Sequence, residues 1–220
     1  MSGHWLRLFE DTLAPGASRA LPARPRVLYV RAGALEARAD GSAARVAAGA
    51  AWHAAGACEV TAGPAGASVL RWELARGTAD AAASGAGVAS PPLLEHALDL
   101  DPATPYLARC DRVDFAPGGV ALPHRHRGGG IRCLLAGTLD VSVGDAPPRR
   151  MTPGSAWFES GREPVLAAAS PEAPTSFVRV SILPWELRGR SSIVYVDPAD
   201  AARGRPRQYT VFVDAPIELG

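Results

Sequence analysis

Two histidines that alternate with arginines are the residues of this chain best suited to chemistry. They lie in the run Pro-His-Arg-His-Arg at 123–127. Side chains two residues apart on a β-strand face the same side, so His124 and His126 can point together into a protein interior while the arginines point away. Two imidazoles on one strand face have the geometry of metal ligands. The sequence therefore places candidate chemistry in its second half.

An internal repeat supplies the elements that must position these histidines. The repeated segments are short, rich in β-branched and aromatic residues and bounded by Gly or Pro, which is typical of an all-β sandwich or barrel. Trp52 and Trp157 occupy equivalent places, which indicates shared core packing. The repeated β-like segments are 27–37, 49–60 and 67–74 in the first half and 131–141, 154–165 and 176–183 in the second.

The repeat divides the chain into parts of ordinary domain size. A low-complexity stretch of small residues reads as a linker between two lobes. After the second lobe, a tail with β-like runs at 192–196 and 209–213 flanks a loop at 200–208. We expect that tail to wrap a barrel or a dimer partner. The expected parts are an N-terminal lobe at 1–76, a linker at 77–92, a C-terminal lobe at 93–190 and a C-terminal β extension at 191–220.

The second half resembles the cupin superfamily at its first motif, a Gly, five residues, His-x-His and a later Gly. Gly118, His124, His126 and Gly137 fall on that pattern. The second motif, a Pro-Gly turn before an aromatic strand, is recognisable at 152–161. The resemblance implies two tandem double-stranded β-helix, or jelly-roll, barrels, an arrangement called a bicupin.

The departures from the family pattern are as informative as the matches. Gly130 stands where the family usually has its glutamate ligand, and Pro164 or Val165 stands where the second motif ends in histidine. In the first repeat, Ala-Arg-Pro at 23–25 replaces the histidine motif entirely. We therefore expect the first lobe to be degenerate and structural, and the second to keep part of a metal site.

Two imidazoles alone hold a divalent metal weakly, so a third ligand is needed. The resemblance places the strand that ends at Glu159 beside the histidine strand, which makes Glu159 the candidate metal ligand with His124 and His126. Such a set suits Fe, Mn, Ni or Zn. Alternatively, Glu159 lies at the rim, bonded to Arg162 or a backbone amide, and the histidines are only hydrogen-bonded inside an apolar barrel.

Arg132 is the second charged residue expected in the barrel. Strand alternation points it inward, and a buried arginine is costly unless something anionic meets it. Its planar guanidinium can bind a substrate carboxylate beside the metal. Equally, it can form an internal ion pair with Glu159 or Asp140.

Composition narrows the partners. With 23 basic and 22 acidic residues, the net charge of +1 disfavours nucleic acid and anionic membranes and favours small molecules. Every basic side chain is arginine, which excludes a lysine Schiff base. Three scattered cysteines indicate reduced thiols. With no leader-like or membrane-length apolar run, we expect a cytoplasmic protein, and the family implies a homodimer.

Two classes of function follow. In the first, a metalloenzyme acts on a small organic acid, with Arg132 holding a carboxylate and Glu159 as ligand or general base. In the second, the barrel binds a small, carboxylate-bearing ligand without turnover, or the protein is a structural bicupin with a degenerate site. A shared scaffold does not decide between them.

Overall fold

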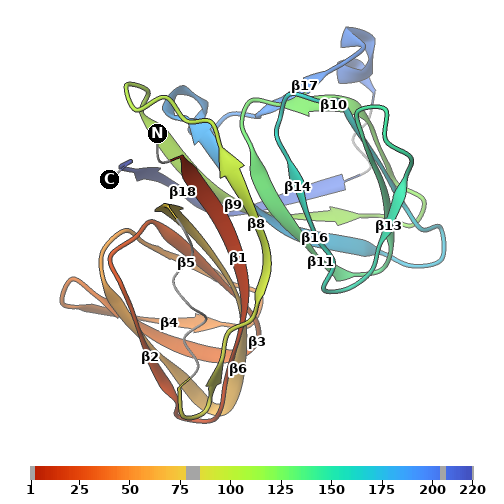
Figure 1. The fold of residues 1–220 in the computed structure, drawn as a ribbon. Helices are drawn as coiled ribbons and strands as arrows, with labels where there is room; N and C mark the ends of the chain where they lie inside the picture. The colour runs from red at the N-terminus through yellow and green to blue at the C-terminus, as the bar shows by residue number, and fades with distance from the viewer. Residues whose placement is uncertain (1–2, 78–84, 204–206, 220) are drawn as a thin grey trace. The chain divides into compact units, whose positions relative to one another are not determined.

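A computed structural model describes residues 3–77, 85–203 and 207–219 (Figure 1). It confirms the all-β class, since the only helices in these ranges are two short 3-10 helices, η1 (Trp185–Leu187) and η2 (Pro198–Ala202). Neither has the length or hydropathy to span a bilayer. Contacts divide the chain into Met1–Thr104 with Ile217–Gly220, the first unit, and Pro105–Pro216, the second unit. The strand pairings of the described residues trace open sheets, not a closed barrel.

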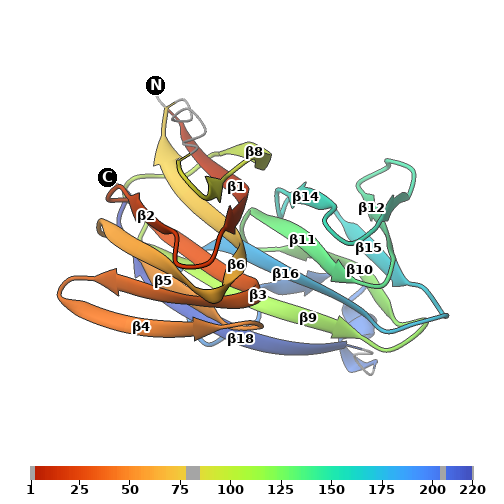
Figure 2. The ribbon, with the colours of Figure 1, turned by 90° about the horizontal axis from the view of Figure 1, so that it is seen from below.

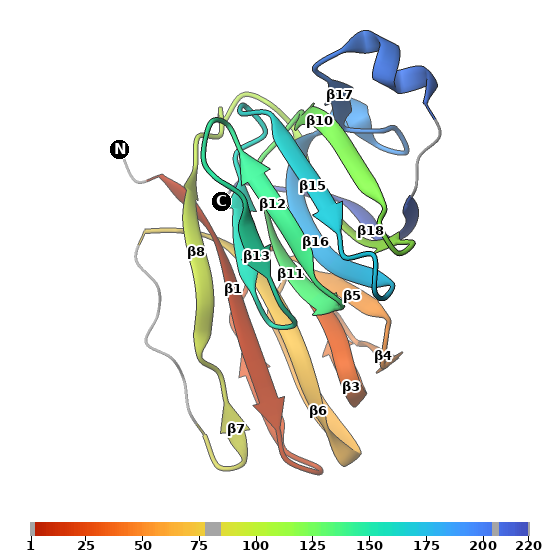
Figure 3. The ribbon, with the colours of Figure 1, turned by 90° about the vertical axis from the view of Figure 1, so that its right-hand side faces the viewer.

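The first unit is built on one eight-stranded sheet with the path β4-β3-β6-β1-β7 (Figure 3). Off this path, β2 pairs with β6, β5 with β3 and β8 with β1. Leu28, Val30 and Val69 lie in its core, and Trp52 packs against them. The strands are β1 (His4–Leu13), β2 (Ser18–Leu21), β3 (Arg26–Ala39), β4 (Ser42–Ala47), β5 (Ala51–Ala54), β6 (Cys58–Arg76), β7 (Val88–Ala89) and β8 (Pro92–Leu98).

Because strand β8 belongs to the first unit, the boundary between the units lies later in the chain than the sequence predicted. It pairs antiparallel with β1, with His4 opposite Leu98. This pairing satisfies the backbone groups of 92–98 within the first unit. The division at Thr104 is therefore later than the expected boundary at 93. Much of the expected linker, residues 78–84, lies outside the described residues.

The second unit contains two five-stranded sheets, β13-β12-β15-β10-β17 and β14-β11-β16-β9-β18. Figure 3 shows β10, β15, β12 and β13 of one sheet, and Figure 2 shows β11, β16, β9 and β18 of the other. The strands are β9 (Tyr106–Phe115), β10 (Val120–His126), β11 (Gly130–Ala136), β12 (Leu139–Val143), β13 (Arg149–Met151), β14 (Ala156–Glu159), β15 (Val165–Ala169), β16 (Thr175–Pro184), β17 (Ile193–Tyr195) and β18 (Arg207–Ile217).

The core of the second unit takes side chains from both sheets. Leu139 and Val165 from one sheet pack with Phe115, Trp157 and Phe177 from the other. The Trp157 and Phe177 rings meet edge to face with centroids 5.3 Å apart, a favourable aromatic geometry. Trp157 is thus a buried core residue, and Trp52 is partly buried and packs against the core of the first unit, in line with the shared packing that the repeat predicted.

The C-terminal tail completes both sheets of the second unit. β17 pairs with β10, placing Tyr195 opposite His124 and Ile193 opposite His126. β18 lies at the edge of the other sheet, next to β9. The two predicted tail strands are therefore confirmed. Residues 204–206 of the expected loop lie outside the described residues.

Candidate functional site

His124 and His126 are both buried near the end of β10. Their rings meet edge-on, with centroids 4.8 Å apart and planes at 86°. Both line one cavity of about 20 Å³ in the second unit, whose remaining wall is largely apolar. The alternation that predicted two rings on one strand face therefore brings them to the same cavity.

The tautomer of His124 follows from its hydrogen bond. Its Nδ1 lies 2.7 Å from the Leu122 carbonyl oxygen. A carbonyl only accepts, so Nδ1 carries the proton and Nε2 has a free lone pair. Burial lowers the pKa of His124, outweighing the effects of the Leu122 carbonyl and Glu159 that raise it. At neutral pH this ring is uncharged and Nε2 is a hydrogen-bond acceptor.

His126 is more constrained. Its Nε2 lies 3.3 Å from Glu159 Oε2, and its Nδ1 lies 3.4 Å from Ser192 Oγ. Burial is the main cause that lowers the pKa of His126 to about 3, so the ring is neutral. The carboxylate accepts, which assigns the proton to Nε2. Only the Nδ1 lone pair remains, and it faces the Ser192 hydroxyl.

Glu159 ends β14 opposite Gly130 of β11 and is committed to its neighbours. Arg132 Nη2 lies 2.7 Å from Oε2, and Trp157 Nε1 donates to Oε1 over 2.9 Å. Burial alone would raise the pKa of Glu159, but the Arg132 charge and the bonds from His126 and Trp157 hold it below its usual range. Burial lowers the pKa of Arg132 to about 10, so the two form a buried ion pair at neutral pH.

Of the alternatives weighed for Arg132, the internal pair with Glu159 is the contact that the structure contains. Asp140 instead pairs on the surface with Arg150, with both nitrogen–oxygen distances 3.0 Å. Arg132 is not among the residues that line the histidine cavity. Its guanidinium is therefore occupied by a protein carboxylate and is not available to a substrate.

A three-ligand metal centre does not fit this arrangement. It needs Glu159 and both imidazoles to direct lone pairs at one point, yet Glu159 accepts from Trp157 and His126 and pairs with Arg132. The Nε2 of His126 is used as a donor. Across residues 3–77, 85–203 and 207–219, no group of three or more His, Cys, Asp or Glu side chains is placed to hold a metal ion.

Packing explains the glycine at the expected glutamate position. A Cβ on Gly130 would lie 2.4 Å from the Val180 carbonyl oxygen and 2.7 Å from Ser181 Oγ. A Cβ on Gly128 would lie 2.2 Å from the Ile182 carbonyl oxygen. Both glycines allow the loop and β11 to approach the backbone of β16 closely. No larger residue is accommodated there without a shift of β16.

Sequence reasoning missed three polar residues of the cavity wall, namely Arg179, Arg207 and Tyr209. Arg179 pairs with both oxygens of Asp111 at 2.6 and 2.9 Å. Arg207 is buried; its Nε donates to the Tyr209 hydroxyl, while its Nη2 has no hydrogen-bond partner in the described chain. The two-residue spacing of 207 and 209 was the available signal, but 207 was assigned to a loop.

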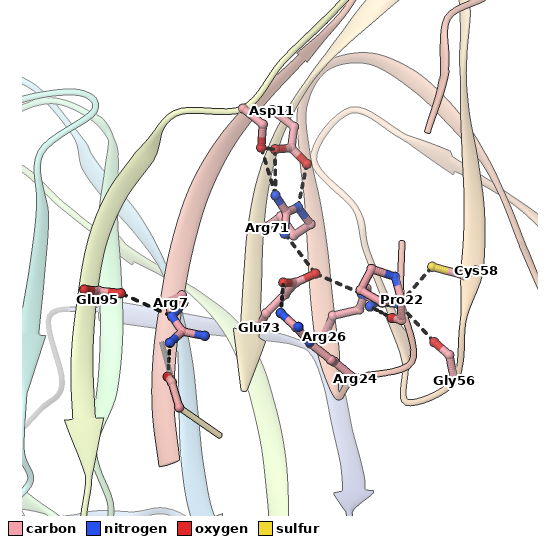
Figure 4. Close-up of polar contacts among 12 residues, drawn as sticks. Arg7, Asp11, Pro22, Arg24, Arg26, Gly56, Cys58, Arg71, Glu73 and Glu95 are labelled. Carbon is pink, nitrogen blue, oxygen red and sulfur yellow. Dashed lines mark hydrogen bonds and ion pairs between the residues drawn. The ribbon is translucent and has the colours of Figure 1, made fainter. Parts of the chain in front are cut away.

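The first unit has a buried ion network at the corresponding place (Figure 4). Arg71 lies opposite Leu28 as Arg179 lies opposite Arg132 in the repeated strands. Arg71 Nε lies 2.7 Å from Asp11 Oδ2. Its guanidinium also contacts Glu73, with a nitrogen–oxygen distance of 2.8 Å.

Comparison with known proteins identifies the fold. No protein-family model and no curated protein sequence matches this chain. A point mutant of Bacillus subtilis oxalate decarboxylase OxdC matches with a TM-score of 0.68 and 12% identity, over 92% of this chain and 74% of that chain. AerE from Microcystis aeruginosa matches with a TM-score of 0.58 and 16% identity, over 80% of this chain and 87% of that chain.

A third match is named for the fold itself. It is a cupin 2 conserved barrel domain protein from Leptotrichia buccalis, with a TM-score of 0.50 and 13% identity, over 83% of this chain and 85% of that chain. Identities this low establish a shared architecture and do not transfer an activity.

Proposed function

We propose that this chain, which has the cupin fold, binds a small carboxylate-bearing molecule in its second unit. The observation that carries the proposal is the buried side chain of Arg207, which lines the histidine cavity and whose Nη2 has no hydrogen-bond partner in the described chain. A buried donor without a partner costs free energy. A carboxylate would remove that cost through a charge-assisted hydrogen bond.

The other arginines near the cavity have partners already. Arg179 is held by Asp111, whose charge and hydrogen bonds outweigh burial and raise the pKa of Arg179 above its usual range. Arg132 is held by Glu159. Arg207 is therefore the cavity arginine with unused capacity to bind an anion.

His124 adds a second point of recognition. Its neutral Nε2 accepts a hydrogen bond and makes none to a described residue. Next to the cationic donor of Arg207, this acceptor matches a carboxylate that carries a neighbouring hydroxyl, or a protonated carboxyl group.

The cavity volume limits what enters this inner site. About 20 Å³ is little more than the roughly 10–15 Å³ that one water needs. A ligand could therefore place no more than its head group there. Oxalate decarboxylases are among the structural neighbours, which supports small carboxylates as the ligand class. Since Glu159 is committed to Arg132, we propose binding and assign no reaction.

Titration calorimetry with formate and acetate, against sodium chloride at equal ionic strength, tests the proposal. We expect one saturable site in the wild type and a loss of affinity of roughly tenfold or more in Arg207→Gln. Arg203→Gln is the matched control, because Arg203 is an exposed arginine that pairs with Asp200. If Arg207→Gln binds both acids as the wild type does, or if the wild type binds neither, the proposal is wrong.

A further inference from the structure

A larger cavity of about 330 Å³ adjoins the histidine cavity within the second unit. Its wall is formed by parts of β9, β16 and β18 and by the segment 189–193. Arg179 and Tyr209 line both cavities, so the two spaces share a wall. This volume lies at the lower end of the range of about 300–1,000 Å³ that is usual for small-molecule sites.

Tyr209 separates the inner cavity from the larger one. The guanidinium carbons of Arg179 and Arg207 each lie 5.8 Å from the centroid of its ring. Cations at this distance from an aromatic ring are held by its quadrupole. Tyr209 and Arg179 therefore stand between the two cavities, and a ligand in the larger cavity reaches Arg207 only when the Tyr209 ring is displaced.

Most charges in the larger cavity are neutralised by protein groups. Arg109 pairs with Asp214 at 3.0 and 2.9 Å, and Arg179 pairs with Asp111. Arg109 Nη1 also donates to the backbone oxygen of Arg190 over 2.6 Å, which fixes the segment that carries Arg190. These pairs shape the cavity without adding net charge.

Arg190 is the exception in this wall. Its side chain is exposed, and it forms no ion pair with any residue in the described ranges. Since Arg190 lines the larger cavity, it marks the part of the wall that reaches solvent. Among the described arginines that line the two cavities, Arg207 and Arg190 are thus the two without an anionic protein partner.

We infer that the ligand of the second unit is an elongated dicarboxylate. Its inner carboxylate binds Arg207, its body occupies the larger cavity, and its outer carboxylate pairs with Arg190. The inference rests on the proposed function for the inner carboxylate. It adds two requirements, a preferred chain length and a second carboxylate on the ligand. A site that binds only one head group would impose neither.

Calorimetry with two matched series tests the inference: the dicarboxylates succinate, adipate and suberate, and the monocarboxylates butyrate, hexanoate and octanoate. We expect the wild type to favour at least one dicarboxylate over the monocarboxylate of equal length by about fivefold, the upper range for a solvent-exposed charge pair. Arg190→Gln should abolish that preference, because it lowers the affinity for dicarboxylates more than the affinity for monocarboxylates.

Arg188→Gln is the control, because Arg188 stacks on Trp185 at 5.0 Å, lies outside the cavity wall and undergoes the same change of charge. If acids bind through Arg207 but dicarboxylates have no advantage, or Arg190→Gln keeps that advantage, the inference is wrong and the proposed function stands. If Arg207→Gln binds every acid as the wild type does, the proposed function itself fails.

Discussion

The interiors of the two units use an equivalent arginine in different ways. In the first unit, Arg71 is enclosed by Asp11, Glu73 and Ser90. In the second, Arg179 has Asp111 as its carboxylate partner and borders two cavities. The same strand register thus supports a closed ion network in one unit and a cavity wall in the other.

The difference lies in which polar atoms are left over. In the first unit, Glu73 also accepts from Arg26 Nε at 3.3 Å, so the network satisfies its own carboxylates. Arg7 Nη1 and His53 Nε2 lack hydrogen bonds there, but neither residue lines that unit's cavity of about 570 Å³. In the second unit Arg132 Nη2 and Arg207 Nη2 lack hydrogen bonds of regular geometry. Arg132 Nη2 is in ion-pair contact with Glu159 at 2.7 Å and Arg132 does not line the histidine cavity, whereas Arg207 lines it. The proposed binding site is placed in the second unit because an unpartnered donor and a cavity occur together there.

The largest effect should come from breaking the closed network. Glu73→Leu would leave Arg26 and Arg71 without a shared carboxylate partner, and removing one member of a buried ion pair costs about 3–5 kcal/mol. We expect the free energy of unfolding in urea to fall by that amount. Glu36→Leu is the control, because Glu36 forms an exposed pair with Arg38 and should cost less than about 1 kcal/mol. Equal losses in the two variants would refute a special role for the network.

Acid should weaken the second unit through His126. The pKa of its ring is 6.5 ordinarily and about 3 in the folded protein, so below pH 6.5 the unfolded chain binds a proton that the folded chain does not. The contribution of His126 to the free energy of unfolding is therefore fully present above pH 6.5 and is lost as the pH falls towards 3. At pH 5 the loss is about 2 kcal/mol.

His126→Gln tests this by removing the titrating ring. Its free energy of unfolding should change less than that of the wild type between pH 7 and pH 5, measured by urea unfolding. His96→Gln, at an exposed histidine of the first unit, should keep the wild-type slope. A wild-type slope in His126→Gln would assign the acid sensitivity to other groups.

Removing Arg207, the unpaired cation of the histidine cavity, should stabilise the protein, whereas the loss of Glu73 should destabilise it. In the absence of ligand, Arg207→Leu eliminates a buried unpaired donor, and we expect the free energy of unfolding to rise by about 1 kcal/mol. Acetate should no longer raise the thermal midpoint of this variant. A destabilised Arg207→Leu would show that Arg207 is structural, as Arg71 is, and the contrast between the units would lose its basis.

Sequence patterns correctly predicted the features that depend on local periodicity, namely the strands and the directions of their side chains. The two-residue spacing of His124 and His126, the repeated strands and the paired Trp52 and Trp157 all follow from alternation within one strand or from the repeat. These features define the all-β scaffold and the shared direction of the two imidazoles.

Cross-strand register was beyond the same reasoning. The pairing of Arg132 with Glu159 depends on how β14 aligns with β11. The sequence alone was compatible with either Glu159 or Asp140 as the partner of Arg132. Arg207 and Tyr209 enter the wall because β18 joins the sheet beside β9, about a hundred residues away along the chain. Likewise, the unit boundary depends on β8 pairing with β1.

The smallest effect is expected from metal ions. Mn(II) or Zn(II) should raise the free energy of unfolding of the wild type only slightly. A bound ion stabilises the folded state only when its concentration exceeds its dissociation constant. Glu159 must first break its ion pair with Arg132 before it can bind a metal, which weakens metal binding. We expect protein purified without a histidine tag to contain well under one equivalent of Fe, Mn, Ni or Zn by elemental analysis. His124→Ala is the matched variant and should give the same low content.

One full equivalent in the wild type that disappears in His124→Ala would show that Glu159 exchanges Arg132 for a metal. The second unit would then differ from the first by a metal site and not by an unpaired arginine.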